Sequence, residues 1–192
     1  MTVLPEYPHP PLTVAEYVDL PEDDQYRWEL QEGALVMSPS ATALHMRAIR
    51  RLCRQLEDQL SAEFDVVPDV DVDLRLVPAD KPGFVRRPDL VVVDAGTVER
   101  TEDEHRLIRA AEVRLIVEIV SPGSVRMDHV TKRYEYAEAG IGHYWIVDLA
   151  RPASLLACHQ AGELGYADNG EFTGTFAVDT PFPVTIDLSA LR

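Results

Sequence analysis

The segment LIVEIV, residues 115–120, constrains the fold of this chain more than any other stretch of its sequence. A run of branched apolar residues of this length is typical of a strand that is buried on both faces of a sheet. Glu118 interrupts the run with a carboxylate. An unpaired charge in such a position costs several kcal/mol, so Glu118 needs a cation, a metal ion or a proton beside it. The segment predicts a central strand that carries a polar site.

A second apolar strand is expected at RPDLVVV, residues 87–93, with Asp89 at the start of the apolar run. Along the first strand, alternation puts Glu118 on one face with Ile116 and Val120. If the two strands are neighbours, their carboxylates form a hard-oxygen site suited to Mg²⁺, which binds through one or two carboxylates and retains several waters. Spacing alone leaves open the alternative of a strand-end aspartate and a glutamate that is paired with an arginine.

The remaining segments predict a mixed β-sheet flanked by helices, that is, an α/β (α+β) fold. Leucine periodicity predicts the longest helix over residues 42–62, and Thr13 with Glu16 forms a capping-box pattern at the start of a short one. A hairpin is expected around the turn 31–33. The other expected helices are 101–111 and one from Ser124 to Gly140, and the other expected strands lie in 143–150, in 154–160 and in the turn-rich tail from Gly162.

The segment VVPDVDVDLRLVP, residues 66–78, has the clearest period-two pattern in the chain. Its valines and leucines fall on one side, and Asp69, Asp71 and Asp73 fall on the other. Three carboxylates in a row suggest a metal site, but the pattern is more typical of the solvent-facing side of an antiparallel strand. We therefore expect a strand with a wet acidic face here.

Charge restricts the partners that the chain can bind. It has 18 Lys and Arg against 33 Asp and Glu, a net charge of −15 at pH 7. Such a charge repels phosphate backbones at long range, so nucleic-acid binding has to rest on local basic clusters. Each cluster, taken alone, is more simply a solvated face. The clusters are Arg47, Arg50, Arg51 and Arg54; Arg86 and Arg87; and Arg126, Lys132 and Arg133.

Length and composition predict a single domain over residues 1–192, with an extended proline-rich arm at 1–11 and a β-rich C-terminal extension at 150–192. No run of about 18 apolar residues exists, so no membrane span is expected. The N-terminus lacks the basic start and apolar core of a secretion signal. Cys53 and Cys158 lack metal-type spacing and are expected to be reduced thiols of a cytoplasmic protein.

Several ordered blocks together resemble a known family. The blocks are RPDLVVV (Arg87–Val93), VEIVSP (Val117–Pro122), D-x-x-x-K-x-x-x-Y (Asp128, Lys132, Tyr136), A-G-x-x-x-Y-W-I-V-D (Ala139–Asp148) and WELQEGALVMSPS (Trp28–Ser40), the last followed by His45. They cover roughly residues 12–150. In this order they resemble the Uma-type family, a set of small restriction-endonuclease-like proteins within the PD-(D/E)xK nuclease superfamily.

The resemblance implies a nuclease-type core, a mixed sheet with helices on both sides and a metal site at one edge. It implies that Asp89 and Glu118 are metal ligands and catalytic residues, with the carbonyl of Ile119 completing the metal shell. Val120 stands where the superfamily has its lysine, although E-x-V is usual for this family. The resemblance makes Lys132, on the following helix, the catalytic substitute for that lysine.

Other matching positions carry further expectations. Glu29 is a catalytic candidate that completes the metal shell or positions its waters, and its alternative is an exposed strand carboxylate. His45, Asp128 and Tyr136 are expected to line the cleft. Without the resemblance, His45 is a partly buried helix residue, Tyr136 a structural hydroxyl and Lys132 an exposed i,i+4 partner of Asp128.

The implied function is that of an endonuclease, dependent on Mg²⁺ or Mn²⁺, that hydrolyses the phosphodiester bonds of DNA. DNA would be bound by the local basic clusters despite the acidic net charge. Two alternatives stay open. One is a catalytically inactive nuclease-fold protein with a binding or regulatory role, and the other is a metal-dependent hydrolase of small phosphate esters. A homodimer is compatible with the resemblance, and no membrane partner is expected.

Overall fold

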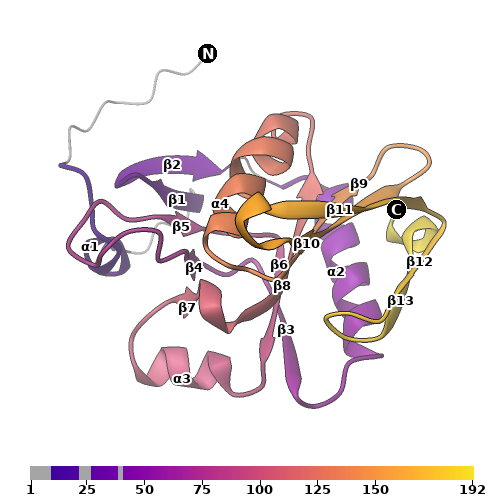
Figure 1. Ribbon diagram of the computed structural model, residues 1–192, viewed down its shortest axis with the longest axis horizontal. Coiled ribbons are helices and arrows are strands. Elements are labelled where there is room, and N and C mark those ends of the chain that lie inside the picture. The colour runs from indigo at the N-terminus through magenta and orange to yellow at the C-terminus, as the bar shows by residue number, and fades with distance from the viewer. Residues whose placement is uncertain (1–9, 22–26, 39–40) are drawn as a thin grey trace.

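The computed structural model describes residues 10–21, 27–38 and 41–192. Residues 1–9 of the expected N-terminal arm lie outside this part, and the last two residues of the arm belong to no helix or strand. Within the described residues, the strands form a six-stranded sheet, a five-stranded sheet and a two-stranded hairpin (Figure 1). Helices lie beside these sheets, so the predicted mixed sheet flanked by helices is confirmed.

Strand β8 (Val113–Val120) lies inside the six-stranded sheet, whose order is β11-β10-β9-β8-β6-β3. It runs antiparallel to β6 (Leu90–Asp94) and parallel to β9 (His143–Asp148). Val117 packs in one hydrophobic cluster and Ile116 in another on the opposite face, so the predicted burial on both faces is confirmed. The outer strands are β3 (Phe64–Pro68), β10 (Ser154–Gln160) and β11 (Tyr166–Thr173).

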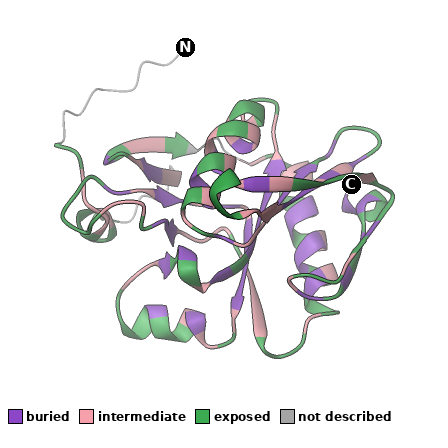
Figure 2. Cartoon of the chain, in the orientation of Figure 1, coloured by how far each residue is buried: buried purple, intermediate pink, exposed green. Residues whose placement is uncertain are grey.

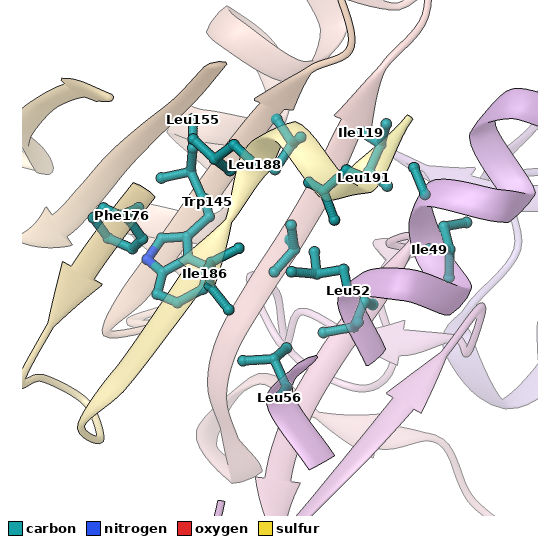
Figure 3. Packing of buried hydrophobic residues seen from close by; sticks show 14 of the residues in the cluster. Ile49, Leu52, Leu56, Ile119, Trp145, Leu155, Phe176, Ile186, Leu188 and Leu191 are labelled. Carbon is teal, nitrogen blue, oxygen red and sulfur yellow. The ribbon is translucent and has the colours of Figure 1, made fainter. Parts of the chain in front are cut away.

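Helix α2 (Ala43–Glu57) covers one face of this sheet. It begins where predicted, with Thr42 as its N-cap, but it ends at Glu57 rather than near residue 62. In the turn that follows, the N–H groups of Gln59 and Leu60 donate to the carbonyl of Leu56. The hairpin of β12 (Thr175–Val178) and β13 (Val184–Asp187) packs beside it. In Figure 3 the side chains that meet are those of Ile49, Leu52, Leu56, Ile119, Trp145, Leu155, Phe176 and Ile186.

The segment between β8 and β9 packs on the opposite face of the sheet from α2. After two α-helical residues at 125–126 it forms a short π-helix, η2 (Met127–Lys132), and continues as α4 (Arg133–Glu138). Gly140 stops it as predicted, with φ at +78°, and the N–H of Ile141 donates to the carbonyl of Tyr136 as in a Schellman motif. The predicted helix is thus present, with wider turns in its first half.

The five-stranded sheet, in the order β2-β1-β5-β4-β7, lies beside helix α1 (Val14–Val18). The predicted capping box of Thr13 and Glu16 is present at the start of this helix. β1 (Arg27–Gln31) and β2 (Ala34–Ser38) form the predicted hairpin. The other strands of the sheet are β4 (Val72–Asp73), β5 (Val85–Arg86) and β7 (Ile108–Arg109).

Residues 66–78 do not form the strand that their alternation predicts. β3 ends at Pro68, and the backbone then takes positive φ at Asp69 (55°) and again at Arg75 (54°). Non-glycine residues rarely adopt this conformation because their Cβ crowds the backbone. The chain therefore bends twice, and only β4 remains between the bends as a strand of the other sheet.

The acidic side chains of this segment are paired with arginines, so the expected wet face is wrong. The Nε atom of Arg87 donates to Oδ1 of Asp69 at 2.9 Å, and its Nη1 lies 3.6 Å from Oδ1 of Asp71. Asp73 is buried and accepts a hydrogen bond from the N–H of Arg75. This burial follows because β4 lies between β5 and β7 rather than at an edge.

The expected helix at residues 101–111 is displaced toward the N-terminus. Helix α3 spans Thr97–Asp103 and follows Gly96, whose φ is +77°. The rest of the segment is taken up by β7, which pairs in parallel with β4, and by a 3₁₀ turn at Ala110–Glu112. Pairing with a distant strand overrides the local helical pattern here.

Burial is concentrated along β6, β8 and α2 (Figure 2). Cys53 and Cys158 are free and buried, as predicted. In the part of the chain that the structure describes, no helix is long and apolar enough to cross a membrane.

Candidate active site

Asp89 lies where the two sheets meet, between the end of β5 and the start of β6, and β6 pairs with β8. Its Oδ2 atom accepts a hydrogen bond from the backbone N–H of Ile119 at 2.7 Å. Its Oδ1 atom lies 2.8 Å from Nε2 of His45, in the first turn of α2. Strand β8 and helix α2 therefore fix both oxygens of this carboxylate at one edge of the sheet.

A pocket of about 470 Å³ opens at this edge. Its walls come from the first turn of α2, the end of β8, the following loop 121–124, the start of the next helical segment at Val125, and residues 148–150 at and after the end of β9. The predicted site residues that line it are His45, Asp89, Glu118, Ile119, Asp128 and Lys132. Glu29 and Tyr136 do not line it, but both contact the lining residues from behind.

Lys132 is buried and points at the carboxylates rather than at solvent. Its Nζ atom donates to Oε1 of Glu118 at 2.8 Å and lies 3.1 Å from Oε1 of Glu29. The hydroxyl of Tyr136 donates to the same Oε1 of Glu118 at 2.8 Å. The alternative of an exposed lysine is therefore wrong, and the helix after β8 delivers an amine to Glu118.

A buried ion network supports this arrangement from behind. The guanidinium of Arg86, fully buried, donates from Nη1 to Glu29 at 2.9 Å. It also makes a bidentate contact with Glu135, from Nε at 2.6 Å and from Nη2 at 2.7 Å. Glu29 is itself buried and also accepts the backbone N–H of Arg87 at 3.1 Å. The alternative of an exposed strand carboxylate at Glu29 is wrong.

Sequence reasoning missed the structural part played by Arg86 and Glu135. Arg86 counts only as a member of a basic cluster, and Glu135 passes as one more charge on a helix. One signal was available. Arg86 directly follows apolar residues in a strand, and Glu135 lies three residues after Lys132, on the neighbouring part of the helix surface.

Carboxylates outnumber the single ammonium around Lys132, and this excess affects the pKa values of both Lys132 and Glu118. Burial alone would lower the pKa of Lys132, but Glu118, Glu29 and Asp128 raise it above its ordinary value, so the ammonium stays protonated. Burial raises the pKa of Glu118 to about 8, against the attraction of Lys132 and with help from Asp89. Both directions follow from several carboxylates sharing one ammonium.

Glu118→Gln is expected to remove part of the pH dependence of stability. Between pH 4.5 and about 8 the folded state keeps a proton on Glu118 that the unfolded state releases, so the free energy of unfolding falls as pH rises. Glutamine retains an acceptor for Lys132 and Tyr136 but carries no charge. At pH 8 without divalent metal, Tm of the variant should therefore exceed that of the wild type by about 2 °C or more.

Thermal melts at pH 5 and pH 8 measure this effect. At pH 5 the two proteins should differ little, because Glu118 is protonated in the folded wild type. A variant that is less stable than the wild type at pH 8 would contradict the raised pKa.

The oxygen atoms at the pocket suit a hard cation. The hydrogen bonds to Glu118 from the described side chains end on Oε1, which leaves Oε2 for another partner. Asp89 supplies a second carboxylate, and the carbonyl of Ile119 faces the same neighbour as its N–H. Two carboxylates and a carbonyl, completed by water, match the preference of Mg²⁺. Among the residues described, no group of three or more His, Cys, Asp or Glu side chains is arranged to hold a metal.

A mixed sheet with helices on both faces, and acidic residues at the edge where β6 and β8 meet, define a restriction-endonuclease-like fold. Comparison with protein families identifies the particular family within this fold. The model of Uma2, described as "Putative restriction endonuclease", matches residues 14–189, so the chain belongs to the Uma2 family.

A solved structure confirms the fold. The crystal structure of "a putative nuclease belonging to DUF820 from Anabaena variabilis" is similar with a TM-score of 0.71 and 16% sequence identity. The match covers 94% of this chain and 97% of that one. No curated protein matches the chain significantly.

Proposed function

We propose that this chain is an endonuclease that uses Mg²⁺ or Mn²⁺ to hydrolyse phosphodiester bonds of DNA. One observation carries the proposal: Asp89, Glu118 and Lys132 meet at one pocket, two carboxylates from adjacent strands and an ammonium from the next helix. The description of the Uma2 family supports nuclease chemistry.

In this proposal Asp89 and Glu118 hold the metal, and the carbonyl of Ile119 is available as a third ligand. Such an ion, when bound, activates water and stabilises negative charge on the phosphate. Lys132 stays protonated and offers its charge to the phosphate oxygen on which negative charge develops. Water adds to phosphorus and gives up one proton to solvent, the P–O ester bond breaks, and the leaving oxygen takes up a proton from solvent.

Two further side chains position these groups. His45 contacts Asp89 and thereby fixes the orientation of its carboxylate. Glu29 lies between Arg86 and Lys132, so it holds the amine beside Glu118. Burial opposes the ionisation of Glu29, but Lys132 and Arg86 lower its pKa below the ordinary value, so it remains a carboxylate.

Lys132→Met is expected to lower kcat for hydrolysis of bis(p-nitrophenyl) phosphate about a hundredfold, because one preorganised charge is lost from the transition state. Affinity for Mn²⁺, measured by calorimetry, should change much less than kcat, since the oxygen ligands remain. A variant with unchanged kcat would contradict the role of the amine.

The chain offers a matched control in its other lysine. Lys81 is exposed, and its partner among the described residues is the exposed Asp80, at 3.4 Å. Lys81→Met should retain the wild-type rate. Far-UV circular dichroism and thermal melts of both variants separate a loss of chemistry from a loss of fold.

The net charge of −15 favours a second candidate, a metal-dependent hydrolase of small phosphate esters. Comparing plasmid DNA with bis(p-nitrophenyl) phosphate decides between the two. A protein that binds neither Mn²⁺ nor Mg²⁺ in calorimetry, and cleaves neither substrate, would instead be the inactive binding or regulatory protein.

The two free, buried cysteines support a cytoplasmic protein. The participation of β10 and β11 in the same sheet as β8 supports one domain that includes the C-terminal extension. Pairing with a second copy of the chain remains a prediction from the family resemblance.

A further inference from the structure

Most cations of the expected basic clusters are engaged within the protein. Arg86 and Lys132 are buried, and Arg87 pairs with Asp69. The remaining pairs are those of Arg51 with the carbonyls of Ala190 and Arg192, Arg54 with Asp58 and Arg133 with Asp168. In the described part of the chain, the cluster members that are exposed without such a partner are Arg47, Arg50 and Arg126.

A duplex would need more contacts than these. Proteins that grip double-stranded DNA neutralise about 6–10 phosphates with Lys and Arg. The three exposed cluster members without such a partner are fewer, and they stand on a molecule with a net charge of −15. Binding of substrate must therefore draw on the pocket itself rather than on the phosphates of a long duplex.

The pocket has an ionic floor and an aliphatic wall. The carboxylates of Asp89 and Glu118 form the floor, and Leu44, Val125 and Leu149 form part of the wall together with apolar side chains of β8 and of the two loops. The pocket is also lined by Asp69 with its two partners Arg27 and Arg87. Its volume of about 470 Å³ falls in the range of small-ligand pockets, about 300–1,000 Å³. A base held in a stacked pair cannot enter such a pocket, whereas one unpaired nucleotide can.

Resting on the nuclease function proposed above, we infer that the pocket accepts one unpaired nucleotide. Its base lies against the aliphatic wall and its phosphate reaches the ionic floor. The enzyme therefore cuts single strands and unpaired stretches in preference to intact duplex. The bond broken and the water consumed are those of the hydrolysis already described.

The test compares four substrates in Mn²⁺: a single-stranded oligonucleotide, the same sequence as a blunt duplex, a duplex with a central unpaired stretch, and bis(p-nitrophenyl) phosphate. Wild-type protein should cut the single strand and the unpaired stretch at least about tenfold faster than the blunt duplex. The small diester needs no base pocket, so its hydrolysis reports the metal chemistry separately.

Two variants test whether the preference for single strands depends on the pocket. Val125→Trp fills the pocket from its wall, where Val125 is 49% exposed, and should lower cleavage of the single strand about tenfold or more. Val130→Trp is the matched control, because Val130 is 58% exposed on the same helical segment but does not line the pocket. It should cut the single strand at the wild-type rate.

The outcomes distinguish failure of the nuclease function from failure of the preference for an unpaired nucleotide. If the small diester is hydrolysed but duplex is cut as fast as single strand, the nuclease proposal stands and the unpaired-nucleotide inference fails. The inference fails likewise if the diester alone is hydrolysed, or if Val125→Trp and Val130→Trp cut the single strand equally well. If no substrate is hydrolysed, the nuclease function itself is overturned.

Discussion

Replacing Asp89 with asparagine is expected to lower metal-dependent phosphodiester hydrolysis about a thousandfold or more. Asparagine is close in size and keeps an oxygen that can accept the N–H of Ile119, so the local structure should survive. What is lost is the negative charge that draws a divalent ion to the pocket. Glu118→Gln should have a similar effect on the rate, since it removes the other carboxylate.

The same strand provides the control. Asp94 is the last residue of β6, at the other end of the strand from Asp89, where its exposed carboxylate pairs with Arg114 at 2.6 Å. Asp94→Asn should retain the wild-type hydrolysis rate. Rates on bis(p-nitrophenyl) phosphate and Mn²⁺ calorimetry check the prediction for all three variants. Equal rates in the wild type and in Asp89→Asn would contradict the proposal that Asp89 binds the catalytic metal.

Replacing Arg86 with methionine is expected to destabilise the protein by about 3–5 kcal/mol, because it leaves two buried carboxylates without their common cation. Glu29 and Glu135 are 4% and 7% exposed, so water cannot replace the guanidinium. At about 2–4 °C per kcal/mol for a chain of this size, Tm should fall by about 10 °C. Urea unfolding followed by circular dichroism measures the change in free energy.

An exposed arginine offers the comparison. Arg114 makes a similar bidentate contact with Asp94, at 2.8 and 2.6 Å, but its side chain is 51% exposed. Arg114→Met should cost about 1 kcal/mol or less, since solvent screens such pairs. If the two arginine variants lose the same stability, burial does not make the Arg86 ion pairs more important to stability than exposed ones.

Local patterns predicted the parts of the fold that local physics determines. The continuous apolar run in LIVEIV identified the strand that is buried on both faces, and Gly140 marked the end of the helix that follows it. These two inferences need only residues that are close in sequence, together with the general rule that apolar faces are covered. The pairing of Asp89 with Glu118 needed the family resemblance, because spacing alone left an alternative open.

Contacts between distant segments account for the misses. Nothing in the alternation of residues 66–78 signals positive φ at Asp69 and Arg75, which the surrounding sheet imposes. The burial of Arg86 likewise depends on Glu135, which lies 49 positions along the chain and becomes a neighbour only after folding. A charged side chain reads as exposed until its partner is known.

The π-helix at Met127–Lys132 has a consequence for how this segment can vary. In an α-helix each residue advances the direction of its side chain by about 100°. Deleting one residue from this segment would convert its wide π-helical turns into ordinary α-helical turns. The side chain of Lys132 would then rotate away from Glu118, even though every remaining residue stayed the same. The segment thus tolerates exchange of its exposed residues far better than any shortening, and its residue count matters to the site as much as its chemistry does.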